Sequence, residues 1–289
     1  MTPEPAIAPA IEYVQDTGTP FDRALLKVLL GAELSVDEFE ALTEPQNPDG
    51  GFRVRELATP ASVAGRTAEL LTYLVAVGAE EFGTAQAAAD FLIERQRPDG
   101  TWGEADELMA ASPPPHFRPG SPDVIAWETA ATLVALAGMG LPLDFRPPLE
   151  YLKSHRLRQR GGRSFRLEAL LLYSAFRRLE GESSETARAL EAEVQALTQR
   201  SLAVFELNWG IFAMRLGGAG ASAPLVRAFG ELLVAQQRKD SSFGSGTDGS
   251  PLETVLALCA LEQSGMAELP RAERRAPEEP DPADSARAL

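Results

Sequence analysis

A short repeat of three residue types limits the folds open to this chain more than any other feature of its sequence. Residues 46–52, 96–102 and 237–243 each begin with glutamine, have aspartate three residues later and end with an aromatic residue. A pattern that recurs along a chain is typical of stacked supersecondary units. The sequence therefore predicts a repeated architecture.

A looser form of the repeat, glutamine with an aromatic residue six places later, adds three copies. These begin at Gln15, Gln159 and Gln199. Six of the ten glutamines then fit, whereas an aromatic content of 7% predicts fewer than one match by chance. Six copies predict six helical hairpins.

Each residue type of the repeat has a role at a helix end. The glutamine amide both donates and accepts hydrogen bonds, so it can tie its loop to the unpaired backbone groups of a neighbouring helix. Aspartate and glycine favour a turn, and the aromatic residue packs between hairpins. The alternative is a coincidence of surface glutamines and core aromatic residues.

Helical periodicity runs through most of the chain. Residues 66–78 and 128–140 are apolar nearly all round, as in helices buried on both sides. Residues 85–96 and 186–199 have one apolar stripe and one charged face. The alternation predicts an all-α fold of two concentric layers, with an outer helix over residues 8–15. Inner helices are expected to begin near Phe21, Arg66, Val124, Phe165, Phe205 and Leu252.

The chain divides into a helical domain, residues 1–265, and a tail, residues 266–289. The tail has four prolines, mixed charge and no apolar period, so it is expected to be disordered. Residues 111–122 include three consecutive prolines and are expected to form a non-helical excursion over one face.

Composition excludes several classes of function. A net charge of −15 disfavours nucleic acid as a partner. One cysteine, Cys259, excludes an internal disulfide framework, and two histidines make a protein-only zinc site improbable. No apolar run has the length of a membrane span, and the start does not resemble a secretory signal. We expect a cytoplasmic protein without cofactors, and leave open a peripheral position on the inner membrane face.

Residues 96–104, QRPDGTWGE, resemble the glutamine-and-tryptophan repeat of squalene and hopene cyclases. That repeat also occurs in class II diterpene cyclases and, in weaker form, in protein prenyltransferase β subunits. The resemblance covers most of residues 8–265 and implies an α6/α6 toroid, a closed ring of about six helical hairpins. Triterpene cyclases have two such domains, whereas this chain has room for a single β-type domain.

The resemblance also indicates where an acid is expected. Cyclases of this family carry Asp-x-Asp-Asp before Thr-Ala, and the middle aspartate donates the proton that starts carbocation formation. Thr129 and Ala130 match Thr-Ala, but Ile125 and Trp127 replace the first and middle acids, and only Glu128 keeps a carboxyl group. The magnesium, zinc and thioester motifs of related toroids are absent too.

Glu128 and Glu253 are the candidate catalytic acids. Each precedes a threonine at the start of a predicted inner helix, and a third copy of this pattern begins at Arg66. Burial would have to raise the pKa of such a carboxyl group before it could protonate a substrate near neutral pH. The alternative is that these carboxylates only interact with the helix dipole.

Two further sets of residues are candidates for ligand binding. Aromatic side chains on inner helices could stabilise a cation or line an apolar pocket, although core packing explains them equally. The candidate substrate-binding residues are Tyr73, Trp127, Tyr173, Phe176, Phe205, Trp209 and Phe212. A basic segment on the face where inner helices begin could bind a diphosphate, or could be a solvated loop. Its candidate anion-binding residues are Lys153, Arg156, Arg158, Arg160, Arg163 and Arg166.

Two functions of different class remain. The first is an isoprenoid-handling enzyme, a terpene cyclase or isomerase with a non-standard acid. The second is a catalytically silent toroid that binds a lipid or a protein partner. The expected ligand is a small isoprenoid or diphosphate, and a peripheral membrane or protein partner is left open. A protein prenyltransferase subunit is disfavoured by the missing zinc ligands.

Overall fold

The computed structural model describes residues 4–54, 57, 59–158 and 167–272. Within these residues the chain forms twelve α-helices and two short 3-10 helices, η1 (Asp106–Ala111) and η2 (Pro115–Phe117). The only β-type pairs described are isolated bridges at Phe52. The expectation of an all-α fold is thus confirmed.

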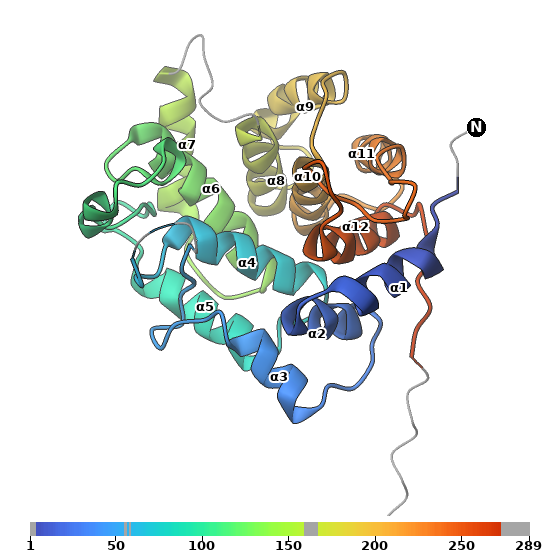
Figure 1. Ribbon diagram of the computed structural model, residues 1–289. Coiled ribbons are helices and arrows are strands. Elements are labelled where there is room, and N and C mark those ends of the chain that lie inside the picture. The colour runs from blue at the N-terminus through green and yellow to red at the C-terminus, as the bar shows by residue number, and fades with distance from the viewer. Residues whose placement is uncertain (1–3, 55–56, 58, 159–166, 273–289) are drawn as a thin grey trace, which may run out of the picture.

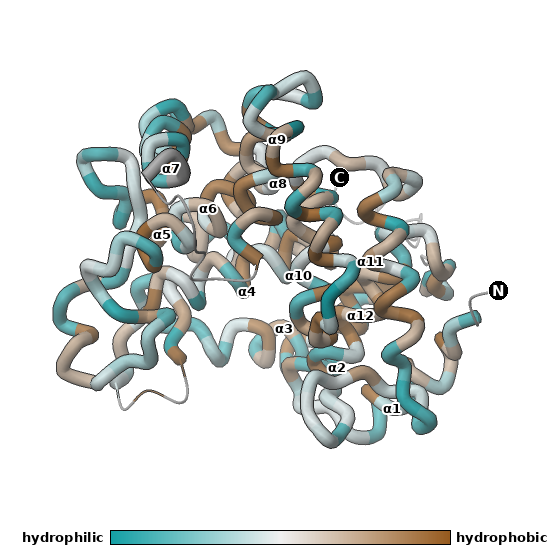
Figure 2. Tube along the Cα trace, turned by 90° about the horizontal axis from the view of Figure 1, so that it is seen from above, coloured by the Kyte–Doolittle hydropathy of each residue, from teal (hydrophilic) through white to brown (hydrophobic). Residues whose placement is uncertain are grey.

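The α-helices form two concentric layers (Figure 1). The inner helices are α2 (Pro20–Leu29), α4 (Ala64–Ala76), α6 (Pro122–Gly138), α8 (Glu168–Glu180), α10 (Val204–Leu216) and α12 (Pro251–Gln263). The outer helices are α1 (Ile7–Thr17), α3 (Val36–Thr43), α5 (Gly83–Glu94), α7 (Arg146–Arg158), α9 (Glu185–Leu197) and α11 (Pro224–Val234). Hydrophobic residues concentrate toward the middle and hydrophilic residues at the periphery (Figure 2).

The predicted inner helices lie where their sequence pattern placed them. Five of the six observed starts fall within two residues of the expected position, and the sixth expected start, Phe165, lies outside the described residues. Proline stands at the beginning of α2, α6 and α12, where its fixed φ suits a helix and its missing N–H is not needed. The observed starts at these helices therefore precede the first apolar residue.

Two contacts close the ring. α12 packs against α1 and α2. Near its end, Gln263 Nε2 and Cys259 Sγ donate hydrogen bonds to the Ala76 carbonyl at the end of α4, at 2.7 and 3.2 Å. The last inner helix is thereby joined to both the first and the second hairpin.

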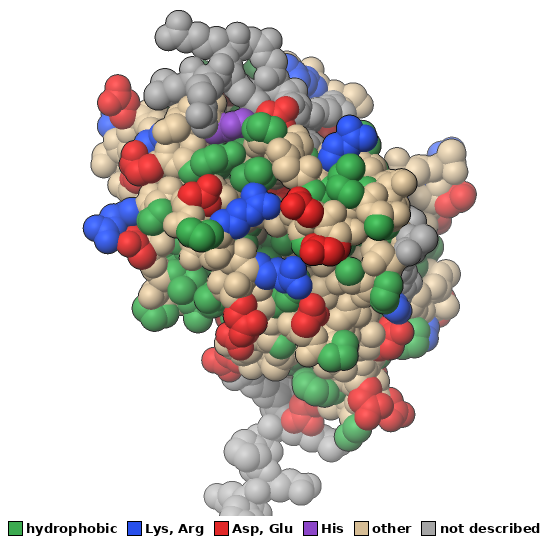
Figure 3. Space-filling view, turned by 90° about the vertical axis from the view of Figure 1, so that its left-hand side faces the viewer, with side chains coloured by type: hydrophobic (Ala, Val, Ile, Leu, Met, Phe, Trp, Pro, Cys, Tyr) green, Lys and Arg blue, Asp and Glu red, His purple; other side chains and the backbone are tan. Residues whose placement is uncertain are grey.

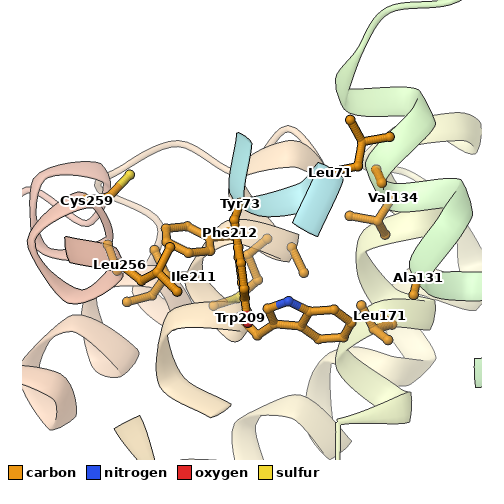
Figure 4. Packing of buried hydrophobic residues seen from close by; sticks show 14 of the residues in the cluster. Leu71, Tyr73, Ala131, Val134, Leu171, Trp209, Ile211, Phe212, Leu256 and Cys259 are labelled. Carbon is orange, nitrogen blue, oxygen red and sulfur yellow. The ribbon is translucent and has the colours of Figure 1, made fainter. Parts of the chain in front are cut away.

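The inner helix α10 reaches across the ring. This helix contacts α4 and α6 across the ring as well as its neighbours α8, α11 and α12. Tyr73 of α4 meets Phe212 of α10 edge to face, with ring centroids 6.2 Å apart. Trp127 of α6 stacks on Trp209 of α10 at 5.3 Å. Figure 4 shows Tyr73, Phe212 and Trp209 side by side, so aromatic side chains fill this part of the ring.

The three strict copies of the repeat form the same hydrogen-bonded turn. The glutamine amide donates to the carbonyl four residues later, at 2.7, 3.1 and 3.0 Å for Gln46, Gln96 and Gln237. The aspartate accepts from the N–H two residues later. The aromatic residues are buried, as expected; they are Phe52, Trp102 and Phe243.

Two of the glutamines also reach the next outer helix. Gln46 donates to the Thr84 carbonyl in the first turn of α5 at 2.9 Å. Gln237 both donates to and accepts from the backbone of Ala6, at the start of α1, at 3.0 and 2.8 Å. These bonds confirm that the glutamine ties its turn to a neighbouring helix end.

The structure corrects the looser form of the repeat. Gln15 and Gln199 are exposed, and Phe205 keeps 48% of its surface in solvent. The N–H of Phe205 donates a hydrogen bond to the Ser245 hydroxyl. In the strict copies the corresponding N–H bonds to a threonine hydroxyl of an inner helix. The copy that begins at Gln159 lies outside the described residues. The number of hairpins was predicted correctly, but the looser spacing rule is not its cause.

Two segment boundaries also differ from the expectation. Residues 111–122 include η2, because a proline at the first position of a helix breaks no hydrogen bond. The chain also keeps contact with the ring beyond residue 265. Leu269 is buried, and Arg271 and the Ala272 N–H bond to the carbonyls of Leu29 and Leu30. The disordered tail remains a prediction, since residues 273–289 lie outside the described residues.

Candidate functional site

A pocket of about 420 Å³ opens on the face where the inner helices begin. It lies between the first turns of α2 and α4, beside the start of α12. Its lining residues are Thr19, Phe21, Asp22, Pro45, Phe52, Arg53, Val54, Arg66, Glu69, Leu70, Phe117 and Leu252. We call it the mouth pocket. Figure 3 shows the side of the molecule on which α4 begins. This surface is hollowed near its middle, among charged side chains.

Apolar side chains from separate elements form one wall of the mouth pocket. Phe21 comes from α2, Leu70 from α4 and Leu252 from α12. Phe117 of η2 packs over this face together with Val54, as part of a small second hydrophobic cluster. Residues far apart in sequence therefore converge because the inner helices begin on the same face.

The charges that line the mouth pocket are balanced. Arg66 and Glu69, one turn apart on α4, form an ion pair at 2.7 Å. The Asp22 carboxylate accepts from the Thr19 N–H at 2.8 Å, in the capping box that starts α2. Arg53 is exposed at the rim. Two arginines thus stand against two carboxylates.

Tyr73 lies beneath the mouth pocket and is almost fully buried. Its hydroxyl donates to Glu69 Oε1 at 2.8 Å. Burial, followed by the nearby Glu69 and Glu253 carboxylates, raises the pKa of Tyr73 well above its ordinary value. Tyr73 is therefore a neutral phenol that holds Glu69 in place.

Glu128 is fully buried between α6 and the start of α4, and it does not line the mouth pocket. Burial and the neighbouring Glu104 carboxyl raise the pKa of Glu128 well above its ordinary value, against the opposing charge of Arg97. The direction of this pKa shift is the one that a general acid requires. The side chain is nevertheless closed to solvent.

Glu253 has different surroundings. It lies half-buried in the first turn of α12 and accepts a hydrogen bond from the Ser245 hydroxyl at 2.5 Å. Its backbone N–H bonds to the Ser250 hydroxyl, the cap of the helix. The structure therefore gives the two candidate acids separate partners.

The threonine that follows each candidate acid has the same role in all three copies of the pattern. The hydroxyls of Thr67, Thr129 and Thr254 accept the backbone N–H of the repeat's aromatic residue, at 2.9, 3.0 and 3.0 Å. Each threonine follows a different side chain, which is Arg66, Glu128 or Glu253. The shared residue of the pattern is thus structural, and sequence reasoning gave it no role.

The predicted aromatic residues are distributed between core and surface. Phe176 and Phe212 are fully buried, Tyr73, Tyr173 and Trp209 nearly so, Trp127 is half-buried and Phe205 is exposed. None of them lines the mouth pocket. Its aromatic wall consists of Phe21, Phe52 and Phe117, which sequence analysis did not select. The sequence did contain a signal for two of them, because Phe21 lies at the start of an inner helix and Phe52 ends the repeat that precedes another.

The predicted anion site is described only at Lys153. Its ammonium group forms ion pairs with Glu180 at 2.6 Å and Glu150 at 3.2 Å. Glu180 is also the main cause of a raised Lys153 pKa. Arg160, Arg163 and Arg166 lie outside the described residues, and the side chains of Arg156 and Arg158, at the end of α7, are not described. The anion site remains a prediction.

Two other classes of site are absent from the described part of the chain. No group of three or more His, Cys, Asp and Glu side chains there could hold a metal ion. Among the same residues, no helix has the length and apolar character needed to cross a membrane.

Comparison with known proteins finds similarity in solved structures. No protein-family profile and no curated protein matches the sequence. The type II terpene cyclase MstE from Scytonema, in its apo form, matches with a TM-score of 0.48 and 15% identity over 86% of this chain and 89% of that chain. An MstE variant in complex with the product merosterolic acid A matches with a TM-score of 0.46 and 17% identity, over 86% and 88%.

A further MstE variant, in complex with the substrate geranylgeranyl dihydroxybenzoate, gives a TM-score of 0.47 and 17% identity over 86% and 88%. These matching structures are terpene cyclases, the class of protein whose repeat residues 96–104 resemble. Identities of 15–17% concern the fold alone.

Proposed function

We propose that this chain is a catalytically silent toroid that binds an isoprenoid in the mouth pocket. The ligand has an apolar chain and a neutral or singly charged head group. The observation that carries this proposal is the composition of the pocket, where an apolar wall faces two arginines and two carboxylates.

The size and lining of the pocket suit such a ligand. Small-molecule sites have volumes of roughly 300–1,000 Å³ and are mostly apolar, with a few polar groups that fix orientation. The mouth pocket, at about 420 Å³, lies in this range. Phe21, Leu70 and Phe117 provide apolar contact, while Arg53 and the Arg66–Glu69 pair stand beside it.

The balance of charge argues against a diphosphate in this pocket. A diphosphate carries several negative charges, and Asp22 and Glu69 offset the two arginines. Electrostatic attraction therefore favours a single carboxylate or a hydroxyl over a diphosphate.

The position of the candidate acid argues against cyclisation. A general acid must come within hydrogen-bond reach of the atom it protonates. Glu128 is fully buried and absent from the pocket lining. A ligand in the mouth pocket therefore cannot take its proton without a rearrangement of α4 or α6.

Thermal-shift measurements test the binding. Farnesol, geranylgeraniol, the corresponding prenyl carboxylic acids and geranylgeranyl diphosphate are the probes, with squalene as a chain without a head group. We expect the alcohol or the acid to stabilise the protein, by about 2.7 kcal/mol at 100 times Kd. The diphosphate should bind more weakly than the acid. If none of these compounds binds, the ligand proposal fails and a protein partner becomes the better function.

Two phenylalanine variants locate the site. Phe117→Ala removes part of the apolar wall and should weaken binding about tenfold. Phe39→Ala is the matched control, because Phe39 is 43% exposed on α3, away from the mouth pocket. Equal affinities for the two variants would place the ligand elsewhere.

A second candidate, an enzyme that uses Glu128 as its acid, is favoured by the raised pKa of that side chain. Product analysis after incubation with farnesyl and geranylgeranyl diphosphate and squalene separates the two functions. Cyclic product that is abolished by Glu128→Gln would establish the enzyme and overturn the silent toroid. We expect no cyclic product from the wild-type protein or from the Glu128→Gln variant.

A further inference from the structure

Glu104 caps the start of α4 with its side chain. It follows the repeat's aromatic residue Trp102 by two positions, and it is buried. Its Oε2 accepts from the Ala64 N–H at 3.0 Å and its Oε1 from the Gly65 N–H at 2.9 Å. Two of the unpaired amides at this helix end are thereby satisfied by one carboxylate.

Glu128 approaches the same place from α6. Both its oxygens are buried, and neither has a hydrogen bond of good geometry with the described residues, although the Glu104 backbone N–H lies close enough to lower the pKa of Glu128 slightly. A Cβ atom on Gly65 would lie 3.3 Å from Glu128 Oε1 and 3.4 Å from Glu104 Oε1. The two carboxyl groups therefore converge over one backbone position, where a Cβ atom would make tight contacts with both.

Two ionised carboxylates cannot satisfy one another, because each only accepts hydrogen bonds. Glu104 already receives two N–H donors at the positive end of a helix. Glu128 accepts no well-formed hydrogen bond from the described residues, and its carboxyl group is satisfied if it carries the proton and donates it to Glu104.

We propose that Glu104 and Glu128 share one proton, and that this carboxyl pair is a pH-sensitive joint between the start of α4 and α6 that alkaline conditions loosen. The proposal is independent of any ligand in the mouth pocket. Of the charged groups around it, Glu104 and Arg97 act on Glu128. Arg97 also donates to the Glu104 backbone carbonyl at 3.3 Å.

The direction of the pH dependence follows from proton linkage. Burial and Glu104 raise the pKa of Glu128 in the folded protein, whereas the unfolded chain has an ordinary glutamate pKa. Stability from this proton is therefore complete below the unfolded pKa and is lost as the pH rises toward the folded pKa. In that window the unfolding equilibrium constant increases by about tenfold per pH unit.

Chemical denaturation from about pH 6 to about pH 9 tests the joint. Glu128→Gln keeps the shape and can donate to Glu104 without a titrating proton. We expect this variant to lose the tenfold-per-unit pH dependence attributed to the pair. Glu185→Gln, an exposed carboxyl group in the first turn of α9, is the control and should keep the wild-type profile. A wild-type slope in Glu128→Gln would overturn the proposal.

A spectroscopic measurement on the wild-type protein decides the matter if the variant does not fold. In protein labelled with carboxyl-¹³C glutamate, one side-chain signal should have the chemical shift of a protonated acid near neutral pH. Glu104→Gln should shift its titration toward lower pH, because the neighbouring negative charge is removed. A spectrum with every glutamate ionised near neutral pH contradicts the shared proton.

Discussion

At the scale of single residues, a buried threonine holds each strict repeat to its inner helix. The Thr129 hydroxyl accepts the Trp102 N–H at 3.0 Å and lies 3.3 Å from the Trp102 carbonyl. Thr129 and Trp102 are both inaccessible to solvent. A lost partner would leave a buried backbone N–H without a hydrogen bond, which is more costly than the bond is favourable.

Thr129→Val should therefore destabilise the protein by about 1–3 kcal/mol, since valine has nearly the same shape but no hydroxyl. Thr132→Val is the matched control on the same helix. Thr132 is equally buried, and its hydroxyl has no hydrogen-bond partner among the described residues. Urea denaturation should show little change for this control. Equal losses in both variants would indicate that β-branched packing, not the hydrogen bond, determines stability here.

Residue roles could be predicted from sequence where they recur with a fixed spacing. The glutamine and aspartate of the repeat bond within their own turn, and the amide chemistry of glutamine also indicated its bond to a neighbouring helix end. The approach of Glu104 to Glu128 was not predicted, because it depends on how α4 packs against α6. Phe117 of the mouth pocket was missed for the same reason, since its position depends on the path of the chain across the ring face.

At the scale of elements, the turn glycine of the repeat sets how closely an outer helix approaches. Gly100 has φ +83° and lies against the first turn of α7. A Cβ atom there would lie 2.6 Å from Pro147 Cβ and 2.8 Å from Pro148 Cδ. Gly50 lies against α5 in the same way, with Ala87 as its neighbour. The turn thus serves as a contact surface between consecutive hairpins.

Gly100→Ala should cost more than Gly78→Ala, and their difference isolates this contact. Both glycines have similar positive φ values, so both substitutions cost about 1 kcal/mol in backbone strain. A Cβ on Gly78 meets no atom within 4 Å, whereas one on Gly100 collides with α7. We expect the Gly100 variant to lose about 1–3 kcal/mol more in denaturation experiments. Matching losses would show that α7 moves aside at no cost.

Element positions could be predicted well because apolar periodicity reflects burial directly. α6 and α10 are apolar on nearly all sides, and both are inner helices. The contacts of α10 with α4 and α6 across the ring were not predictable. A helix that contacts neighbours and a helix that also reaches across the ring have the same sequence pattern.

At the scale of the whole molecule, one glutamine contributes to ring closure. Gln237 makes two hydrogen bonds with the backbone of Ala6, and the two residues are 231 positions apart. The same side chain holds its own turn through the Ser241 carbonyl. The first outer helix is thereby fixed to the last repeat.

Gln237→Ala should lower stability by about 1–3 kcal/mol, because it removes three hydrogen bonds at a half-buried site. It should also reduce the hydrogen-exchange protection of α1 more than that of α6. Gln195→Ala is the control, because Gln195 is exposed on α9 and its side chain bonds to Thr198 nearby. Unchanged exchange in α1 would mean that its packing against α12 is sufficient.

The closure between α1 and α12 has a consequence for synthesis on the ribosome. The ring stays incomplete until its last helix, α12, has been synthesised. Because α12 packs against α1 and α2, the apolar faces of these two helices are uncovered until then. Contacts between such distant residues form slowly, and uncovered faces aggregate in the meantime. Residues Glu4 and Pro5 line the same groove as Met266 and Leu269, so these two segments near the ends of the described chain lie close together. Joining these ends and opening the chain between other hairpins would change which segment must be kept from aggregating during translation.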